Sequence, residues 1–139
     1  MTARNILVAA VVGGMLLAAP AQAESVSLVA HLLGGSNVPA NKSDAFGEAQ
    51  FTYDTATRQL DYYVTYDGIA PSKIDLHGPA AASESGAMAA NIPVSETPVT
   101  GKLTLTPDQG NALLAGRMYV DIHSQAFANG EIRGQIGKH

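Results

Sequence analysis

After residue 24 the chain consists of short runs in which apolar and polar residues alternate, separated by Gly, Pro, Asn, Asp and Ser. In the run 59–66, for example, Leu60, Tyr62 and Val64 occupy every second position. A period of two places such side chains on one face of a β-strand. The pattern predicts strands at 26–32, 47–53, 59–66, 73–77, 101–105, 117–123 and 131–136.

The segments between these runs predict how the strands are connected. Residues 54–58 have turn character, so the strands on either side are expected to form a hairpin. Pro39 makes 38–41 an irregular edge, because proline cannot donate to a strand ladder. Thr106 is a candidate N-cap for a short helix that ends by about residue 115. The alanine-rich segment 80–98 is weakly patterned, and both a helical turn and a strand near 88–92 remain open.

The predicted elements indicate an all-β domain of about seven to eight short antiparallel strands. Strand signals recur about every 10 residues, and no long helical periodicity or fixed-period repeat interrupts them. We therefore expect a β-sandwich or a small barrel.

The first 23 residues have the pattern of a secretory signal peptide. Arg4 supplies a positive start, residues 6–19 are almost wholly apolar, and Ala21-Gln22-Ala23 forms a small-x-small cleavage site. An apolar stretch of this length is shorter than the roughly 20 residues that cross a bilayer. The sequence thus predicts export to the periplasm or the medium, a mature domain at 24–139, and no membrane span after cleavage.

Composition narrows the chemistry of this domain. Removing a 23-residue leader from the 139-residue chain leaves 116 residues, the size of one domain. Without Arg4 there remain seven basic and twelve acidic side chains, a net charge of −5 that argues against nucleic-acid partners. The chain contains no cysteine, which excludes disulfides, thiol chemistry and thiolate metal sites.

An Asp-x-His pattern occurs twice, first with Asp75 and His77 and again with Asp121 and His123. Alternation in a strand places each aspartate and its histidine on the same face. If the two strands are neighbours, two imidazoles and two carboxylates converge, and these ligand types hold zinc or copper without thiolates. The same four groups could equally form hydrogen-bonded pairs that fix the histidine tautomers.

The last strand bears on this cluster. Antiparallel pairing across a loop at 125–129 places Asp121 opposite Arg133, and opposite charges in this position stabilise a sheet by about 0.2–1 kcal/mol. We therefore expect a structural ion pair between Asp121 and Arg133, which would take one carboxylate away from a metal. His31 and His139 are further candidate ligands, although both are more simply explained as incidental.

No catalytic set is recognised. The serines lack the strand-turn-helix elbow of a serine hydrolase, and Gly34-Gly35 is not followed by the lysine and helix of a phosphate-binding loop. The chain is therefore not expected to be an enzyme.

Three stretches, the last of them in two parts, resemble the CHRD domain, a module named after chordin and also found in exported bacterial proteins. The resemblance extends from about residue 26 to residue 136 and is most specific near the C-terminus. The stretches are Leu-Gly-Gly-Ser-Asn-Val-Pro at 33–39, Ile-Asp-Leu-His-Gly-Pro at 74–79, Tyr-Val-Asp-Ile-His-Ser at 119–124 and Asn-Gly-Glu-Ile-Arg-Gly-Gln-Ile at 129–136.

This resemblance implies an immunoglobulin-like β-barrel, distantly similar to copper-zinc superoxide dismutases, in an extracytoplasmic location. It does not imply a settled activity. Asp75 stands where the family tends to have a histidine. Since copper prefers nitrogen to carboxylate oxygen, this departure speaks against dismutase-like redox activity.

Two functions follow as expectations. The first is a non-enzymatic binding module of the cell envelope, whose partner is an unidentified protein or envelope component. The second is a copper- or zinc-binding extracytoplasmic protein that uses His77, His123, Asp75 and Asp121.

Overall fold

The computed structural model describes residues 10, 13, 14 and 24–139, and all of its strands and helices lie within 24–139. The signal peptide predicted over 1–23 therefore falls outside the described residues, apart from those three positions. In the described part, no helix has the length and apolar character needed to cross a membrane. The elements are β1 (Ser25–Leu33), the 3₁₀ turn η1 (Gly34–Ser36), β2 (Phe46–Asp54), β3 (Gln59–Asp67), β4 (Pro71–His77), β5 (Met88–Ile92), β6 (Val99–Thr104), α1 (Pro107–Leu114), β7 (Tyr119–Ser124), β8 (Ile132–Gln135) and β9 (Gly137–Lys138).

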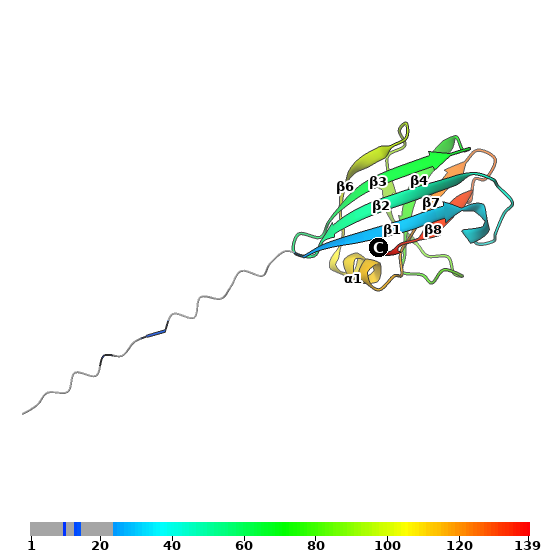
Figure 1. The fold of residues 1–139 in the computed structure, drawn as a ribbon. Helices are drawn as coiled ribbons and strands as arrows, with labels where there is room; N and C mark the ends of the chain where they lie inside the picture. Colours follow the sequence, from blue (N-terminus) through cyan, green and yellow to red (C-terminus); the bar gives the residue numbers. More distant parts are fainter. Residues whose placement is uncertain (1–9, 11–12, 15–23) are drawn as a thin grey trace, which may run out of the picture.

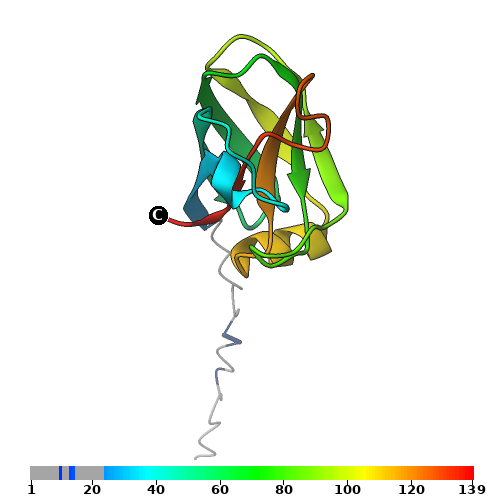
Figure 2. The same cartoon turned by 90° about the vertical axis from the view of Figure 1, so that its right-hand side faces the viewer.

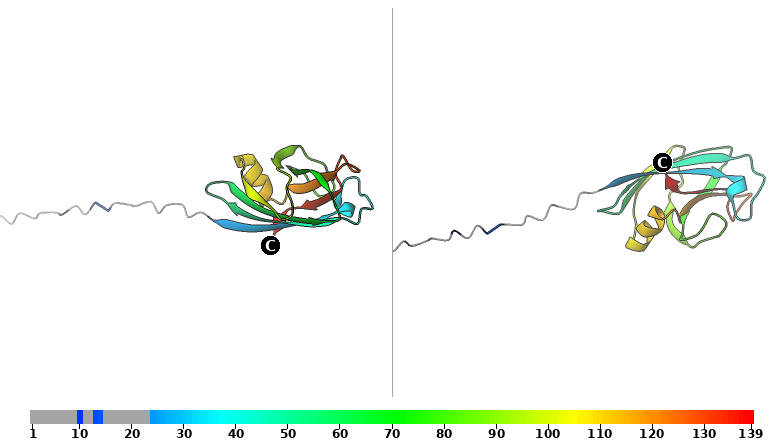
Figure 3. Two further views of the ribbon diagram at one scale, coloured as in Figure 1. Left: turned by 90° about the horizontal axis from the view of Figure 1, so that it is seen from above. Right: turned by 60° about the horizontal axis from the view of Figure 1, so that its bottom comes forward.

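The strands form one antiparallel sheet that curls into a nearly closed barrel (Figure 1). Its order is β5-β4-β7-β8-β1-β2-β3-β6, with β9 also paired to β1. One wall contains β1, β2, β3 and β6, and the opposite wall contains β4, β5, β7 and β8 (Figures 2 and 3). The all-β prediction is confirmed.

The core lies between the two walls and is built by the alternation seen in the sequence. Along β3, Leu60, Tyr62 and Val64 point inward and are buried, whereas Tyr63 between them is 45% exposed. On the opposite wall Ile74 and Ile122 are fully buried. Burying each such side chain stabilises the fold by about 1.5–3 kcal/mol.

Helix α1 covers one end of the barrel (Figure 1). Thr106 caps it as predicted: its hydroxyl accepts a hydrogen bond from the Gln109 N–H at 3.2 Å, and the Gln109 side chain accepts from the Thr106 N–H at 2.9 Å. This capping box satisfies two donors at the helix start. Leu113 anchors the helix by burying its side chain in the core.

The observed elements differ from the prediction in few places. The strand alternative near 88–92 is correct, since β5 pairs with β4. The segment predicted as an irregular edge at 38–41 is a loop without strand pairing. The strand predicted at 131–136 is shorter in the structure, since β8 ends at Gln135, where its pairing with β7 ends. The chain then forms β9, which pairs with β1.

Candidate functional site

The site is built by two strands that are distant in sequence and adjacent in space. β4 and β7 pair antiparallel, with Asp75 directly opposite Asp121 and Ile74 opposite Ile122. Because the isoleucines face the core, the aspartates and the histidines two residues further along lie on the outer face of the wall. The two strands that carry the Asp-x-His patterns are therefore neighbours, as the predicted cluster requires.

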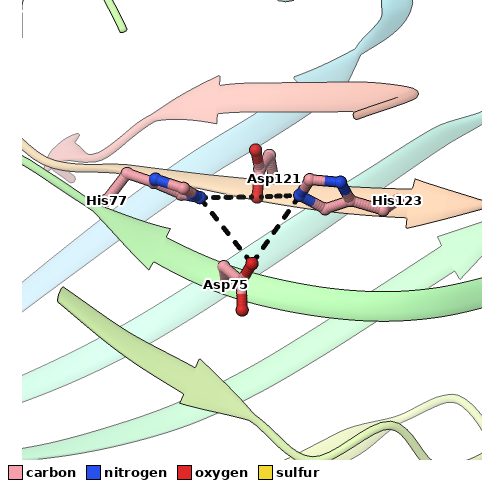
Figure 4. Close-up of side chains that lie close together, drawn as sticks. All are labelled: Asp75, His77, Asp121 and His123. Atoms are coloured by element: carbon pink, nitrogen blue, oxygen red, sulfur yellow. Dashed lines mark hydrogen bonds and ion pairs between the residues drawn. The ribbon is translucent and has the colours of Figure 1, made fainter. Parts of the chain in front are cut away.

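All four predicted side chains meet at one point (Figure 4). The Nε2 atoms of His77 and His123 lie 3.2 and 3.0 Å from Oδ1 of Asp121. The same nitrogens lie 3.8 and 3.7 Å from Oδ2 of Asp75. One potential ligand atom from each residue lies within 4.8 Å of all the others.

Backbone carbonyls fix the orientation of both imidazoles. Nδ1 of His77 lies 3.0 Å from the Gly86 carbonyl oxygen, and Nδ1 of His123 lies 2.8 Å from that of Ala128. A carbonyl can only accept, so each Nδ1 carries the proton and donates it. In a neutral imidazole the Nε2 lone pair would then face carboxylate oxygens, which also only accept. This contact is favourable only if Nε2 or the carboxyl group is protonated, or if a cation lies between the groups.

The cluster is enclosed although it lies on the outer face. Asp75 is fully buried and Asp121 is 5% exposed. Oδ1 of Asp75 accepts a hydrogen bond of 3.0 Å from the Asn91 amide on β5, and the Lys73 ammonium forms an ion pair of 2.9 Å with Oδ2. Nε2 of His77 and Oδ2 of Asp75 are buried without a well-directed hydrogen bond. Nε2 of His77 thus lacks the well-directed partner that a buried polar group normally has, whereas Oδ2 of Asp75 is held by its ion pair with Lys73.

The charges of the cluster change its acid-base behaviour. The Asp121 carboxylate raises the pKa of His77 above its ordinary value, which outweighs the opposing effect of burial. The Asp75 carboxylate likewise raises the pKa of Lys73. Both shifts reflect a negative environment that favours cations.

The expected ion pair between Asp121 and Arg133 does not form. The two residues are direct cross-strand partners, as predicted. However, the Arg133 guanidinium lies over the Tyr119 ring, 3.4 Å from its centroid, and Nη2 donates to the Ala81 carbonyl at 3.1 Å. Tyr119 in turn stacks on His77 with centroids 4.9 Å apart. The guanidinium therefore packs against the aromatic ring, and Oδ1 of Asp121 remains beside the two histidines.

The two remaining histidines do not join the cluster. His31 lies on β1, where its side chain is 69% exposed and pairs with Glu48 at 3.5 Å. His139 lies at the C-terminus, where its backbone N–H donates to Ser27 on β1. Neither belongs to the group of residues positioned to share an ion.

Several contributors to the site were not predicted. Lys73 shares the strand face of Asp75, and the same alternation could have indicated it. Asn91 and the Gly86 carbonyl belong to the segment 80–98, whose weak pattern gave no signal. Their contacts depend on the pairing of β5 with β4.

The residues present fit a divalent metal ion. Two imidazole nitrogens and two carboxylate oxygens form a donor set typical of zinc. A tetrahedral ion with bonds near 2.0–2.1 Å holds its ligand atoms roughly 3.3–3.4 Å apart, close to the nitrogen–oxygen distances of 3.0–3.8 Å found here. Histidines that bind a metal through one ring nitrogen usually donate the other N–H to a carbonyl or carboxylate, which fixes the ring, and both Nδ1 atoms do so here.

Comparison with known proteins gives one match. The CHRD domain model matches residues 28–136, which include every strand from β2 to β8 and all four residues of the cluster. No curated protein and no solved structure matches the chain. The resemblance seen in the sequence is thereby confirmed, and the chain belongs to the CHRD domain family.

Proposed function

We propose that this CHRD domain binds a divalent transition-metal ion, with zinc as the preferred metal, through His77, His123, Asp75 and Asp121. One observation carries the proposal. In both histidines Nδ1 donates to a backbone carbonyl, while Nε2 faces a carboxylate oxygen. Zn²⁺ would replace the Nε2 protons and neutralise the two carboxylates.

The enclosure of the cluster favours metal storage or structural stabilisation over catalysis. Structural zinc sites use four protein ligands, whereas catalytic sites keep one position open. Here four ligands converge, and the side chains of His77 and His123 are only 15% and 12% exposed. The position of the domain outside the cytoplasm, proposed from the leader at 1–23, would make it a zinc-holding module of the cell envelope.

Calorimetric titration of the purified protein with Zn²⁺ and Cu²⁺ tests the proposal. We expect one zinc ion per chain in the wild type and none in a His77→Ala/His123→Ala variant. A His31→Ala/His139→Ala variant is the matched control, because it also loses two imidazoles but none from the cluster. Equal zinc binding by all three proteins would refute the proposal. Stronger binding of Cu²⁺ than of Zn²⁺ by the wild type would refute zinc as the preferred metal.

A binding module for an envelope partner is the second candidate, and one surface favours it. Leu33 and Phe46 are direct partners on β1 and β2, and they are 50% and 53% exposed. They line an open hollow of about 630 Å³ with Tyr66. Crosslinking of exported wild type and of a Leu33→Ser/Phe46→Ser variant tests this role, and a crosslinked product that persists in the variant would count against it.

A further inference from the structure

The outer face of β1, β2 and β3 carries two exposed apolar side chains side by side, Leu33 and Phe46. They lie at the same end of the wall and line the open hollow of about 630 Å³ described above. Exposed apolar side chains that adjoin one another, unlike single ones, mark sites of interaction. What surrounds the pair therefore indicates what it binds.

Two carboxylates adjoin this apolar pair. Asp67 is the cross-strand partner of Phe46 on β3, and Glu48 is two residues from Phe46 on β2, on the same face. Directly paired residues have Cβ atoms about 4.5–5.5 Å apart, and residues two apart along a strand are about 7 Å from each other. One short ligand segment can therefore contact Leu33, Phe46, Glu48 and Asp67 together.

The hollow is acidic. Asp67 and Glu48 line it, and neither lysine nor arginine does. Asp67 is exposed, and no cationic group of the described residues lies within 4.0 Å of its carboxylate. Glu48 lies 3.5 Å from His31, and a carboxylate with about four acceptor positions has room for a further donor. Arg133, which is opposite Leu33 on β8, is buried and outside this lining.

We propose that this hollow binds a segment of a partner protein in which apolar side chains stand beside Lys or Arg. This inference rests on the binding-module role proposed above and adds the chemistry of the partner. The apolar side chains would cover Leu33 and Phe46, and the cation would lie at Asp67 and Glu48. An acidic segment would place like charges against both carboxylates, which disfavours it.

Short peptides test this choice by ¹⁵N NMR, in EDTA so that the metal cluster plays no part. Acetyl-Arg-Leu-Phe-Arg-amide should shift the backbone amide signals of Leu33, Gly47 and Asp67, with a dissociation constant in the millimolar range. Acetyl-Glu-Leu-Phe-Glu-amide reverses the charge, and acetyl-Arg-Ser-Ser-Arg-amide lacks the apolar groups. Each of these two should bind at least about fivefold more weakly.

Three results would overturn the inference. Equal binding of the arginine and glutamate peptides would refute the partner chemistry and leave the binding role of the surface in place. No shift with any peptide would refute the inference as a whole, while the crosslinking experiment above would still decide the binding role. Shifts at these amides on concentrating the protein alone would identify a second copy of the chain as the occupant.

One pair of variants tests the apolar contact. Leu33→Ser/Phe46→Ser should lose binding of the arginine peptide, as followed at the Gly47 amide. Tyr63→Ser/Met88→Ser removes two side chains that are 45% and 53% exposed and lie outside the hollow, so it should bind like the wild type. Equal affinities in the two variants would contradict the assignment of the surface.

A second pair of variants tests the charge. Glu48→Gln/Asp67→Asn should weaken binding of the arginine peptide about fivefold and strengthen binding of the glutamate peptide. Glu84→Gln/Asp108→Asn also removes two exposed carboxylates, but outside the hollow, and should change either affinity less than about twofold. A similar loss in both variants would mean that only the net charge of the domain attracts the peptide, which would refute the proposed cation position.

Discussion

Asp75 and Asp121 are direct cross-strand partners on β4 and β7, so two carboxylates occupy one pair position of the sheet. Like charges in this position destabilise a sheet unless cations separate them. In this domain His77, His123 and Lys73 surround the pair. The arrangement is therefore stable only with positive charge at its centre, whether from protons or from a metal ion.

Zinc should stabilise the protein. At a free zinc concentration 100 times the dissociation constant, binding adds about 2.7 kcal/mol to the free energy of unfolding. For a domain of this size, this raises the Tm by about 10 °C. Calorimetric scans with excess zinc and with EDTA measure the difference. The His77→Ala/His123→Ala variant should show no shift, and a zinc-induced rise that survives in it would contradict the assignment of the ligands.

Lys73 should compete with the metal ion. Its ammonium pairs with Oδ2 of Asp75, the oxygen that also faces both histidines. Lys73→Met removes this competitor, and zinc affinity should rise by a few-fold to about tenfold, since 1.4 kcal/mol corresponds to a factor of ten. Lys102→Met, an exposed lysine on β6, is the control and should leave the affinity unchanged. An unchanged affinity in Lys73→Met would show that the lysine does not occupy the metal position.

Metal-free and zinc-bound protein should respond to pH in opposite directions. The pKa of His77 is raised in the folded state, so its charged form contributes stability that is fully present below the unfolded pKa of about 6.5 and is lost as the pH rises through the folded pKa. Zinc affinity instead increases as the pH rises, because the ligand must lose its proton.

Urea unfolding between pH 5.5 and 8.5, in EDTA and in zinc, measures both effects. In EDTA the stability difference between wild type and His77→Gln should shrink toward alkaline pH. A difference that grows toward alkaline pH in EDTA would mean that His77 is not held by Asp121 as described.

The contact between β8 and β1 should be sensitive to a single methyl group. A Cβ added at Gly134 would overlap the backbone of His31, whereas one added at Gly137 would meet nothing within 4 Å. Gly134→Ala should therefore cost about 1–3 kcal/mol of stability, and Gly137→Ala should cost much less. Urea unfolding of both variants provides the comparison, and equal costs would argue against close packing at Gly134.

Local alternation predicted most of this molecule. It gave the strands, the inward faces and the four residues of the cluster, since each of these depends only on period two. It could not establish that β4 lies beside β7, because that pairing joins segments far apart in the chain. The resemblance to the CHRD domain also implied a barrel, but the adjacency of these two strands stayed open until the structure showed it.

The predicted ion pair of Arg133 was wrong for a physical reason. The register with Asp121 was correct, but a strand register constrains backbones and not the ends of long side chains. The Tyr119 ring, two residues before Asp121 on the same face, offered the guanidinium a flat surface at 3.4 Å. Similarly, β5 was left open because its strand form comes from pairing with β4 and not from its own alanine-rich sequence.

The barrel joins the beginning of the domain to its end, because β1 pairs with both β8 and β9. One side of β1 therefore has no hydrogen-bonding partner until the last residues of the chain have been synthesised. A nascent chain still held by the ribosome cannot complete the fold, and contacts between such distant segments form slowly. If the export predicted from residues 1–23 takes place, this order of assembly would leave the domain unfolded until its C-terminal strands are available.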